Sequence, residues 1–266
     1  IYYMLGNDLE EEVKLEFLDM RDNVIHTYSS KKDSRDRPVK ESPLFYEEED
    51  QRRPSVVSDK AGLNKFNWNL QYPGVTNLDG RQILWSGNTS GPMAIPGNYK
   101  VRLYIGEEMV GEQDFEVKKD PRLVDVSQQD LVAQFELVQT INAKLDTTHA
   151  SINRIRKVRG EINELMGEAK GNEVLQEKEK AMLAALSTIE NELVQTKAEA
   201  TQDVLNFEIK LNNKLASLKG TVATGFGRPT NQQYAVFEDL GAKVDVQLTK
   251  LNAIWNGEYE NVLQEL

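Results

Sequence analysis

The spacing of the apolar residues changes near residue 120, and this change limits the chain to folds that combine two kinds of structure. Before it, apolar residues recur at every second position, as in "YKVRLYI" (99–105). A period of two is typical of a strand with one buried face. After "KKDPRLVDVSQQD" (118–130) they recur every three, four or seven positions, which is typical of one helix face. We therefore predict an α+β chain with two domains, residues 1–120 and residues 121–266.

The first domain is predicted to be an antiparallel sandwich. "VKLEFLD" and "VIHTYSS" flank the turn cluster "MRDN", which predicts a hairpin, and "MVGEQDFEV" (109–117) forms a second hairpin with 99–105. Phe66, Trp68 and Leu70 share one face of a further predicted strand, so Trp68 is expected in the core. About six or seven short strands of this kind favour an immunoglobulin-like β-sandwich.

Residues 31–60 interrupt the strands. This stretch is crowded with charge, contains Pro38, Pro43 and Pro54, and shows neither period. We interpret it as a long charged surface loop whose charges are solvated.

The second domain is predicted to be an antiparallel four-helix bundle. One apolar stripe begins at Leu131 and predicts a helix to about Lys170, spanning roughly 60 Å. Three further stripes follow, and Thr230 with Gln233 forms a capping box before the last one. A coiled-coil dimer is the alternative. The intramolecular bundle is preferred because one chain supplies all the stripes.

Composition excludes several classes of function. The 266 residues carry a net charge of -11 and contain no cysteine. Disulfides, thiolate metal sites and cysteine nucleophiles are therefore excluded, and a nucleic acid partner is not expected because its charge would be repelled. No apolar run is long enough to span a membrane.

No catalytic or metal-binding set is predicted. The 43 acidic residues show no spacing that selects a catalytic pair, and His26 and His149 lie in different predicted domains, each expected at a surface or boundary. The best binding candidates are loop residues: Tyr72 and Trp85, with Arg81 and Asn88 beside them. Exposed aromatic rings can stack on sugars, and the alternative for Trp85 is a plug at the sandwich edge.

Three stretches carry a family resemblance: "VKLEFLDMRDNVIHTYSS", "AGLNKFNWNLQYPG" and "GPMAIPGNYKVRLYIGEEMVGEQDFEV". They resemble the immunoglobulin-like domain of the flagellar-hook-capping type. With "FEVKKDPR" and "RPTNQQYAVFEDL", most of the chain resembles the C-terminal region of bacterial proteins with BNR or sortilin-type β-propellers, commonly labelled glycosyl hydrolases. One departure is that Asn69 follows Trp68 where the pattern usually has an acid.

The resemblance implies a secreted, periplasmic or cell-surface protein with a propeller upstream of this chain. Because "IYYMLG" begins like a strand, without an initiator Met or a signal peptide, we expect a fragment of a longer protein. The expected role is a non-catalytic accessory region, without cofactor or metal, that packs against the propeller or docks a partner. The alternatives are a carbohydrate-binding module and a part of a hydrolase site whose propeller lies elsewhere.

Overall fold

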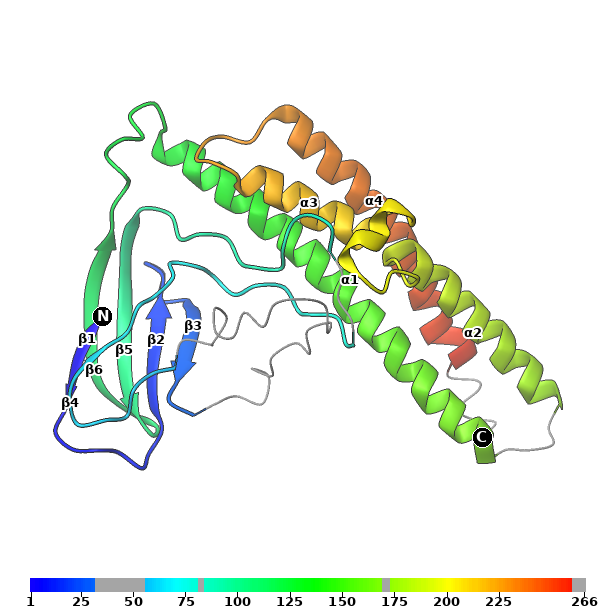
Figure 1. The fold of residues 1–266 in the computed structure, drawn as a ribbon, viewed down its shortest axis with the longest axis horizontal. Coiled ribbons are helices and arrows are strands. Elements are labelled where there is room, and N and C mark those ends of the chain that lie inside the picture. The colour runs from blue at the N-terminus through cyan, green and yellow to red at the C-terminus, as the bar shows by residue number, and fades with distance from the viewer. Residues whose placement is uncertain (32–55, 81–83, 169–172, 260–266) are drawn as a thin grey trace. The chain divides into compact units, whose positions relative to one another are not determined.

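The computed structural model describes residues 1–31, 56–80, 84–168 and 173–259 (Figure 1). Within these residues the fold is mixed α+β, with four α-helices and two small antiparallel sheets. Of the predicted charged loop 31–60, residues 32–55 lie outside the described part, as does the candidate site residue Arg81.

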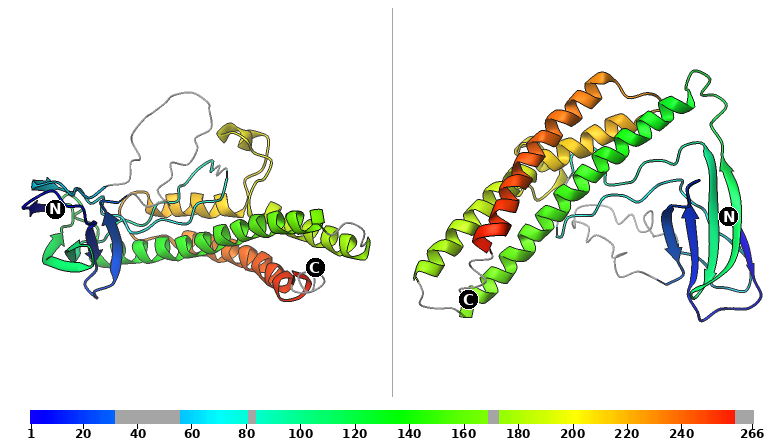
Figure 2. Two further views of the ribbon diagram at one scale, coloured as in Figure 1. Left: turned by 90° about the horizontal axis from the view of Figure 1, so that it is seen from below. Right: turned by 180° about the vertical axis from the view of Figure 1, so that it is seen from behind.

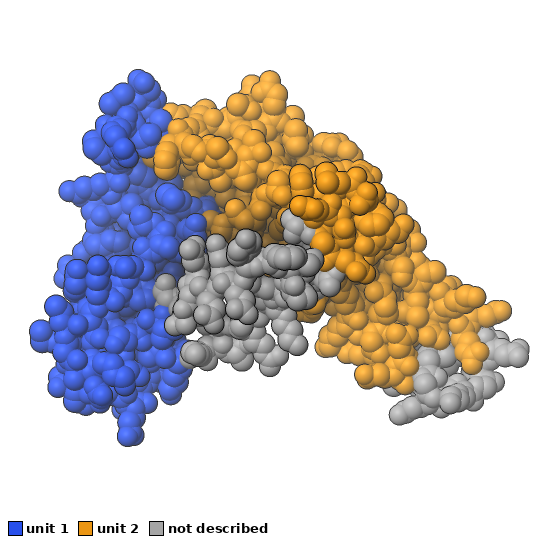
Figure 3. Space-filling model, in the orientation of Figure 1, with its two compact units in different colours: residues 1–73, 92–128 blue, residues 74–91, 129–266 orange. Residues whose placement is uncertain are grey.

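The chain divides into two compact units, which Figure 3 colours separately. The strand unit comprises residues 1–73 and 92–128, and the helical unit comprises residues 74–91 and 129–266. The predicted division at residue 120 assigns residues 74–91 to the strands, whereas they are part of the helical unit here.

The strand unit contains both predicted hairpins. The first joins β2 (Val13–Leu18) to β3 (Val24–Ser29), and the second joins β5 (Gly97–Ile105) to β6 (Glu108–Val117). These strands form one sheet in the order β3-β2-β5-β6. The alternation predicted for β2 is confirmed, because Val13, Leu15 and Phe17 are buried.

The second sheet pairs β1 (Tyr2–Leu5) with β4 (Gly62–Lys65). The strand predicted over Phe66, Trp68 and Leu70 is wrong in position, because β4 ends at Lys65. The Asn69 side chain accepts a hydrogen bond from the Gln71 N–H, and Leu70 has a φ of 61°. Since both features turn the backbone, the extended conformation cannot continue there.

Trp68 nevertheless packs inward, as its parity with Phe66 predicts. Its ring stacks on Phe17 with a centroid separation of 4.7 Å and meets Tyr99 and Phe115 edge-on. Phe66 is buried, and Trp68 and the neighbouring Leu70 are partly buried against the same cluster. Trp68 is therefore part of the hydrophobic core of the strand unit.

The helical unit has the predicted order of helices. These are α1 (Gln128–Glu168), α2 (Glu173–Leu193), α3 (Leu211–Ala223) and α4 (Asn231–Ile254), with a short 3₁₀ helix η1 (Thr201–Leu205) and a π-helical turn η2 (Trp255–Tyr259). Figure 2 shows α1 extending along the whole of this unit. At 41 residues its length is roughly 60 Å, as predicted.

One apolar cluster fills the helical unit. It contains residues of all four helices, and Val75 and Leu78 of the 74–91 segment join it. The predicted capping box is confirmed: Thr230 accepts a hydrogen bond from the Gln233 N–H, and the Gln233 side chain accepts one from the Thr230 N–H. Among the described helices, none combines the length and apolar character that crossing a membrane requires.

Candidate functional site

Residues 74–91 lie between two stretches of the strand unit in the sequence but belong to the helical unit. Side chains of α1 bind their main chain. The Asn153 side chain donates to the Asn77 carbonyl (2.9 Å) and accepts from the Asp79 N–H (2.8 Å). His149, one turn earlier on α1, donates its Nδ1–H to the Thr76 carbonyl at 2.7 Å. Each of these bonds satisfies a backbone group that has no strand partner at this point.

Helix α3 holds the other half of the segment in the same way. The Asn213 side chain accepts from the Trp85 N–H (2.9 Å) and donates to the Ser86 carbonyl (3.0 Å). Ser217, one turn further, also donates to the Ser86 carbonyl. An asparagine amide can pair with a donor and an acceptor at once, so Asn153 and Asn213 each bind two peptide groups.

Lys219 is the most unusual group in this network, because its side chain is almost completely buried. Its ammonium group donates to the Ser90 carbonyl and to Asn88 Oδ1, both at 2.7 Å. Burial disfavours the charged form and lowers the pKa of Lys219 to about 8.

Close backbone contact also fixes the segment. Gly87 has a φ of 79°, and a Cβ at this position would lie 2.0 Å from the Ala216 carbonyl oxygen on α3. Only glycine can therefore occupy this position without moving the segment.

His149 is fully buried, which corrects the prediction that it lies at a surface or boundary. Its Nε2 accepts a hydrogen bond from the Asn212 amide at 3.4 Å, so both ring nitrogens have partners in the neutral form. Burial is the largest influence on the pKa of His149 and lowers it. The folded state therefore resists protonation, and stability is expected to fall as the pH drops below about 6.5.

Of the four residues proposed for carbohydrate binding, the structure describes three, and these three are divided between the two units. Tyr72 lies in the strand unit, half-buried against its core, where burial raises the pKa of its hydroxyl. Trp85 and Asn88 lie in the helical unit. The Trp85 side chain is 48% exposed, whereas Asn88 Oδ1 accepts bonds from Lys219 and Ser90. Arg81 lies outside the described residues, so the set remains a prediction.

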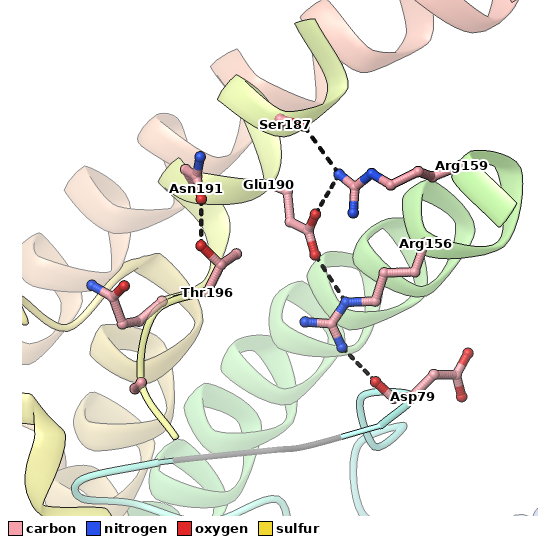
Figure 4. A pocket seen from close by; sticks show the side chains of 9 residues that line it. Asp79, Arg156, Arg159, Ser187, Glu190, Asn191 and Thr196 are labelled. Carbon is pink, nitrogen blue, oxygen red and sulfur yellow. Dashed lines mark hydrogen bonds and ion pairs between the residues drawn. The ribbon is translucent and has the colours of Figure 1, made fainter. Parts of the chain in front are cut away.

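A polar pocket of about 500 Å³ lies between α1, the end of α2 and the 74–91 segment (Figure 4). Glu190 is nearly buried, and its two carboxylate oxygens accept from two arginines of α1. Arg156 Nε lies 2.8 Å from Oε1, and Arg159 Nη2 lies 2.7 Å from Oε2. The lining residues are Asp79, Arg156, Arg159, Ser187, Glu190, Asn191, Gln195, Thr196 and Ala198.

Sequence reasoning did not identify this pocket. Arg156 and Arg159 are three residues apart, which places them on one helix face, and this was a readable signal. Glu190 lies 34 residues from Arg156 in the sequence, and nothing local connects the two. Within the described residues, no group of three or more His, Asp or Glu side chains is arranged to hold a metal ion.

Comparisons with known proteins returned no match. No family model, no curated protein and no solved structure is significantly similar to this chain. The site is therefore interpreted from its own geometry.

Proposed function

We propose that this chain is a non-catalytic accessory region that packs against another domain or docks a partner. The observation that carries the proposal is the use of buried polar groups in the helical unit. His149, Asn213 and Lys219 all hold the main chain of residues 74–91. Histidine and lysine are common catalytic residues in enzymes, but in this chain these side chains bind the chain's own backbone, which is a structural role.

The resemblance noted in the sequence extends this proposal. On that basis we propose that the chain is the C-terminal region of a secreted, periplasmic or cell-surface β-propeller protein of the type labelled glycosyl hydrolase. We also propose that the two sheets form an immunoglobulin-like sandwich and that the helices form an antiparallel four-helix bundle. Two features support this: residues of both sheets share one buried cluster, and residues of all four helices share another.

Removing this chain from the parent protein tests the accessory role. The rate constant kcat for glycoside hydrolysis is expected to stay within about twofold, while thermal stability or partner binding declines. A fall of more than about tenfold in kcat, with the remaining domain still folded, would instead support a contribution to the hydrolase site.

Carbohydrate binding is a second candidate function, and one observation favours it. Trp85 presents about half of its surface to solvent, while its backbone N–H is fixed by Asn213. A held, exposed indole ring is suited to stacking on a sugar face.

A glycan array tests this second candidate. Reproducible binding that Trp85→Ala abolishes would establish it, with Phe226→Ala as a control because Phe226 is a similarly exposed aromatic residue of the same unit. An array without binding, or binding that both variants retain, would rule out Trp85 as the platform.

A further inference from the structure

The pocket beside Glu190 is lined by two arginines and two acids, but both arginines pair with only one of the acids. Two guanidinium groups, from Arg156 and Arg159, share a single carboxylate, and both oxygens of that carboxylate are already occupied. Asp79 lines the pocket too, but it contributes its carbonyl to Arg156, and Figure 4 shows its carboxylate pointing away from the arginines. Where Arg156, Arg159 and Glu190 meet, their charges therefore sum to about +1.

The end of α2 offsets only part of this excess. Glu190 and Asn191 lie in the last turn of α2, which ends at Leu193. A helix C-terminus carries about half of a negative elementary charge, and solvent screens it. The two guanidinium groups thus still dominate the local potential.

The arginines also retain hydrogen-bonding capacity. Each guanidinium has five N–H groups in a planar fork. Arg156 uses one for Glu190 and one for the Asp79 carbonyl, and Arg159 uses its Nη2 for Glu190 and Ser187. Among the described residues, Nε and Nη1 of Arg159 make no hydrogen bond. These two groups lie on opposite edges of the guanidinium plane, so each can donate a charge-assisted hydrogen bond to one oxygen of a carboxylate or phosphate.

We propose that this pocket binds the carboxylate or phosphate group of a small hydroxylated molecule, with Arg159 as the principal contact. A volume of about 500 Å³ lies within the usual range of small-molecule sites. The rest of the lining is rich in hydroxyl and amide groups suited to ligand hydroxyls: Ser187, Asn191, Gln195 and Thr196. This site is independent of the accessory role and of the exposed Trp85.

Calorimetric titration at low ionic strength, where attraction between charges is least screened, tests the proposal. The probes are inorganic phosphate, glucuronate and, as a neutral counterpart, glucose. Saturable binding is expected for phosphate or for glucuronate, and none is expected for glucose. Which of the two anions binds shows whether the site takes a phosphate or a carboxylate group. In NMR spectra the Nε–H signal of Arg159 is expected to shift with the same affinity.

Two charge-removing variants on α1 provide the control. Arg159→Gln is expected to weaken binding at least about tenfold, the effect of losing a charge-assisted hydrogen bond. Glu190 keeps its bond to Arg156 in this variant, so the fold should persist. Lys157→Gln removes the same charge two residues away, where the side chain is 76% exposed, and is expected to change affinity less than about twofold.

If both variants weakened binding equally, the loss of affinity would come from the lower net charge of the protein, and the pocket would not be the binding site. Absence of saturation with both anionic probes, or an unshifted Arg159 signal in the wild-type protein, would also overturn the proposal. The NMR measurement does not depend on any variant folding.

Discussion

The strand unit and the helical unit are stabilised by different kinds of interior. The strand unit has an aromatic core, in which Phe17 contacts the rings of Tyr28, Phe66, Trp68 and Phe115. The helical unit has a mainly aliphatic core, in which Trp255 is the one aromatic residue among the buried members described.

Buried polar and charged side chains lie almost entirely in the helical unit. Of the eight buried polar or charged residues in the described part of the chain, only Asn64 belongs to the strand unit. Four of the seven in the helical unit, Asn142, His149, Asn213 and Lys219, bind backbone carbonyls of the 74–91 segment.

The difference follows from where backbone hydrogen bonds are made. In the strand unit, the backbone groups of the paired strands bond to one another within the sheets, so the side chains of these strands are free to be apolar. The described residues of the 74–91 segment, 74–80 and 84–91, contain no strand of the two sheets, and their buried carbonyls and N–H groups need side-chain partners. The helices supply those partners, and their polar interior results from accommodating an irregular segment.

Phe17→Ala should produce the largest effect, because it opens the centre of the aromatic core. Phe17 is fully buried, and its truncation is expected to cost about 3–5 kcal/mol. Hydrogen exchange measures this: protection of the β5 amides should fall. Phe226→Ala, at a 51% exposed site, should change stability by less than about 0.5 kcal/mol. Unchanged β5 protection in the Phe17 variant would contradict a core centred on this ring.

A pair of glycine variants tests the fit of the 74–91 segment on α3. Gly80 and Gly87 have nearly equal φ values, 80° and 79°, but only Gly87 faces the Ala216 carbonyl. Alanine should cost about 1 kcal/mol at Gly80 from backbone strain alone. At Gly87 the clash should add about 2 kcal/mol in urea unfolding. Equal losses at both positions would show that the close contact with α3 is not needed for stability.

Lys219→Met tests the buried ammonium through pH dependence. The pKa of Lys219 is about 8 in the folded state and 10.5 ordinarily, so between these values the unfolded chain binds more protons. Stability of the wild type should therefore rise from pH 8 to pH 10 relative to the variant, by about 1–2 kcal/mol. Urea unfolding across this range measures it, with Lys157→Met as an exposed control. If the free energy of unfolding changed with pH in the same way in the wild type and the Lys219 variant, the Lys219 amine would be charged and solvated in the folded state.

Trp85→Ala should have the smallest effect. With a side chain that is 48% exposed, its loss should cost less than about 1 kcal/mol in thermal unfolding. A much larger loss would favour the alternative in which Trp85 is a structural plug, and would also complicate its use in glycan binding.

Most of the secondary structure could be predicted because it depends on local periodicity. Both hairpins, the long helix ending near residue 170 and the Thr230 capping box follow from neighbours within a few residues. The strand predicted at 66–70 is misplaced, because the structure ends β4 at Lys65. The apolar period of two continues through Trp68, but this period carries no information about the backbone turn at Leu70.

The candidate site could not be predicted to the same extent. Trp85 and Asn88 were identified by residue type, but their partners Asn213 and Lys219 lie more than 100 residues further along the chain. His149 was expected near a surface because a lone histidine carries no periodic signal, and only the packed segment explains why it is buried.

The sequence by itself determined the two kinds of structure, the order of their elements and the absence of cysteine chemistry. Only the tertiary structure decided that residues 74–91 belong with the helices and that Arg156 and Arg159 share Glu190. The physical reason is the range of the interactions. Periodicity records which face of an element is buried, whereas the pairing of polar groups depends on which distant elements meet at that face.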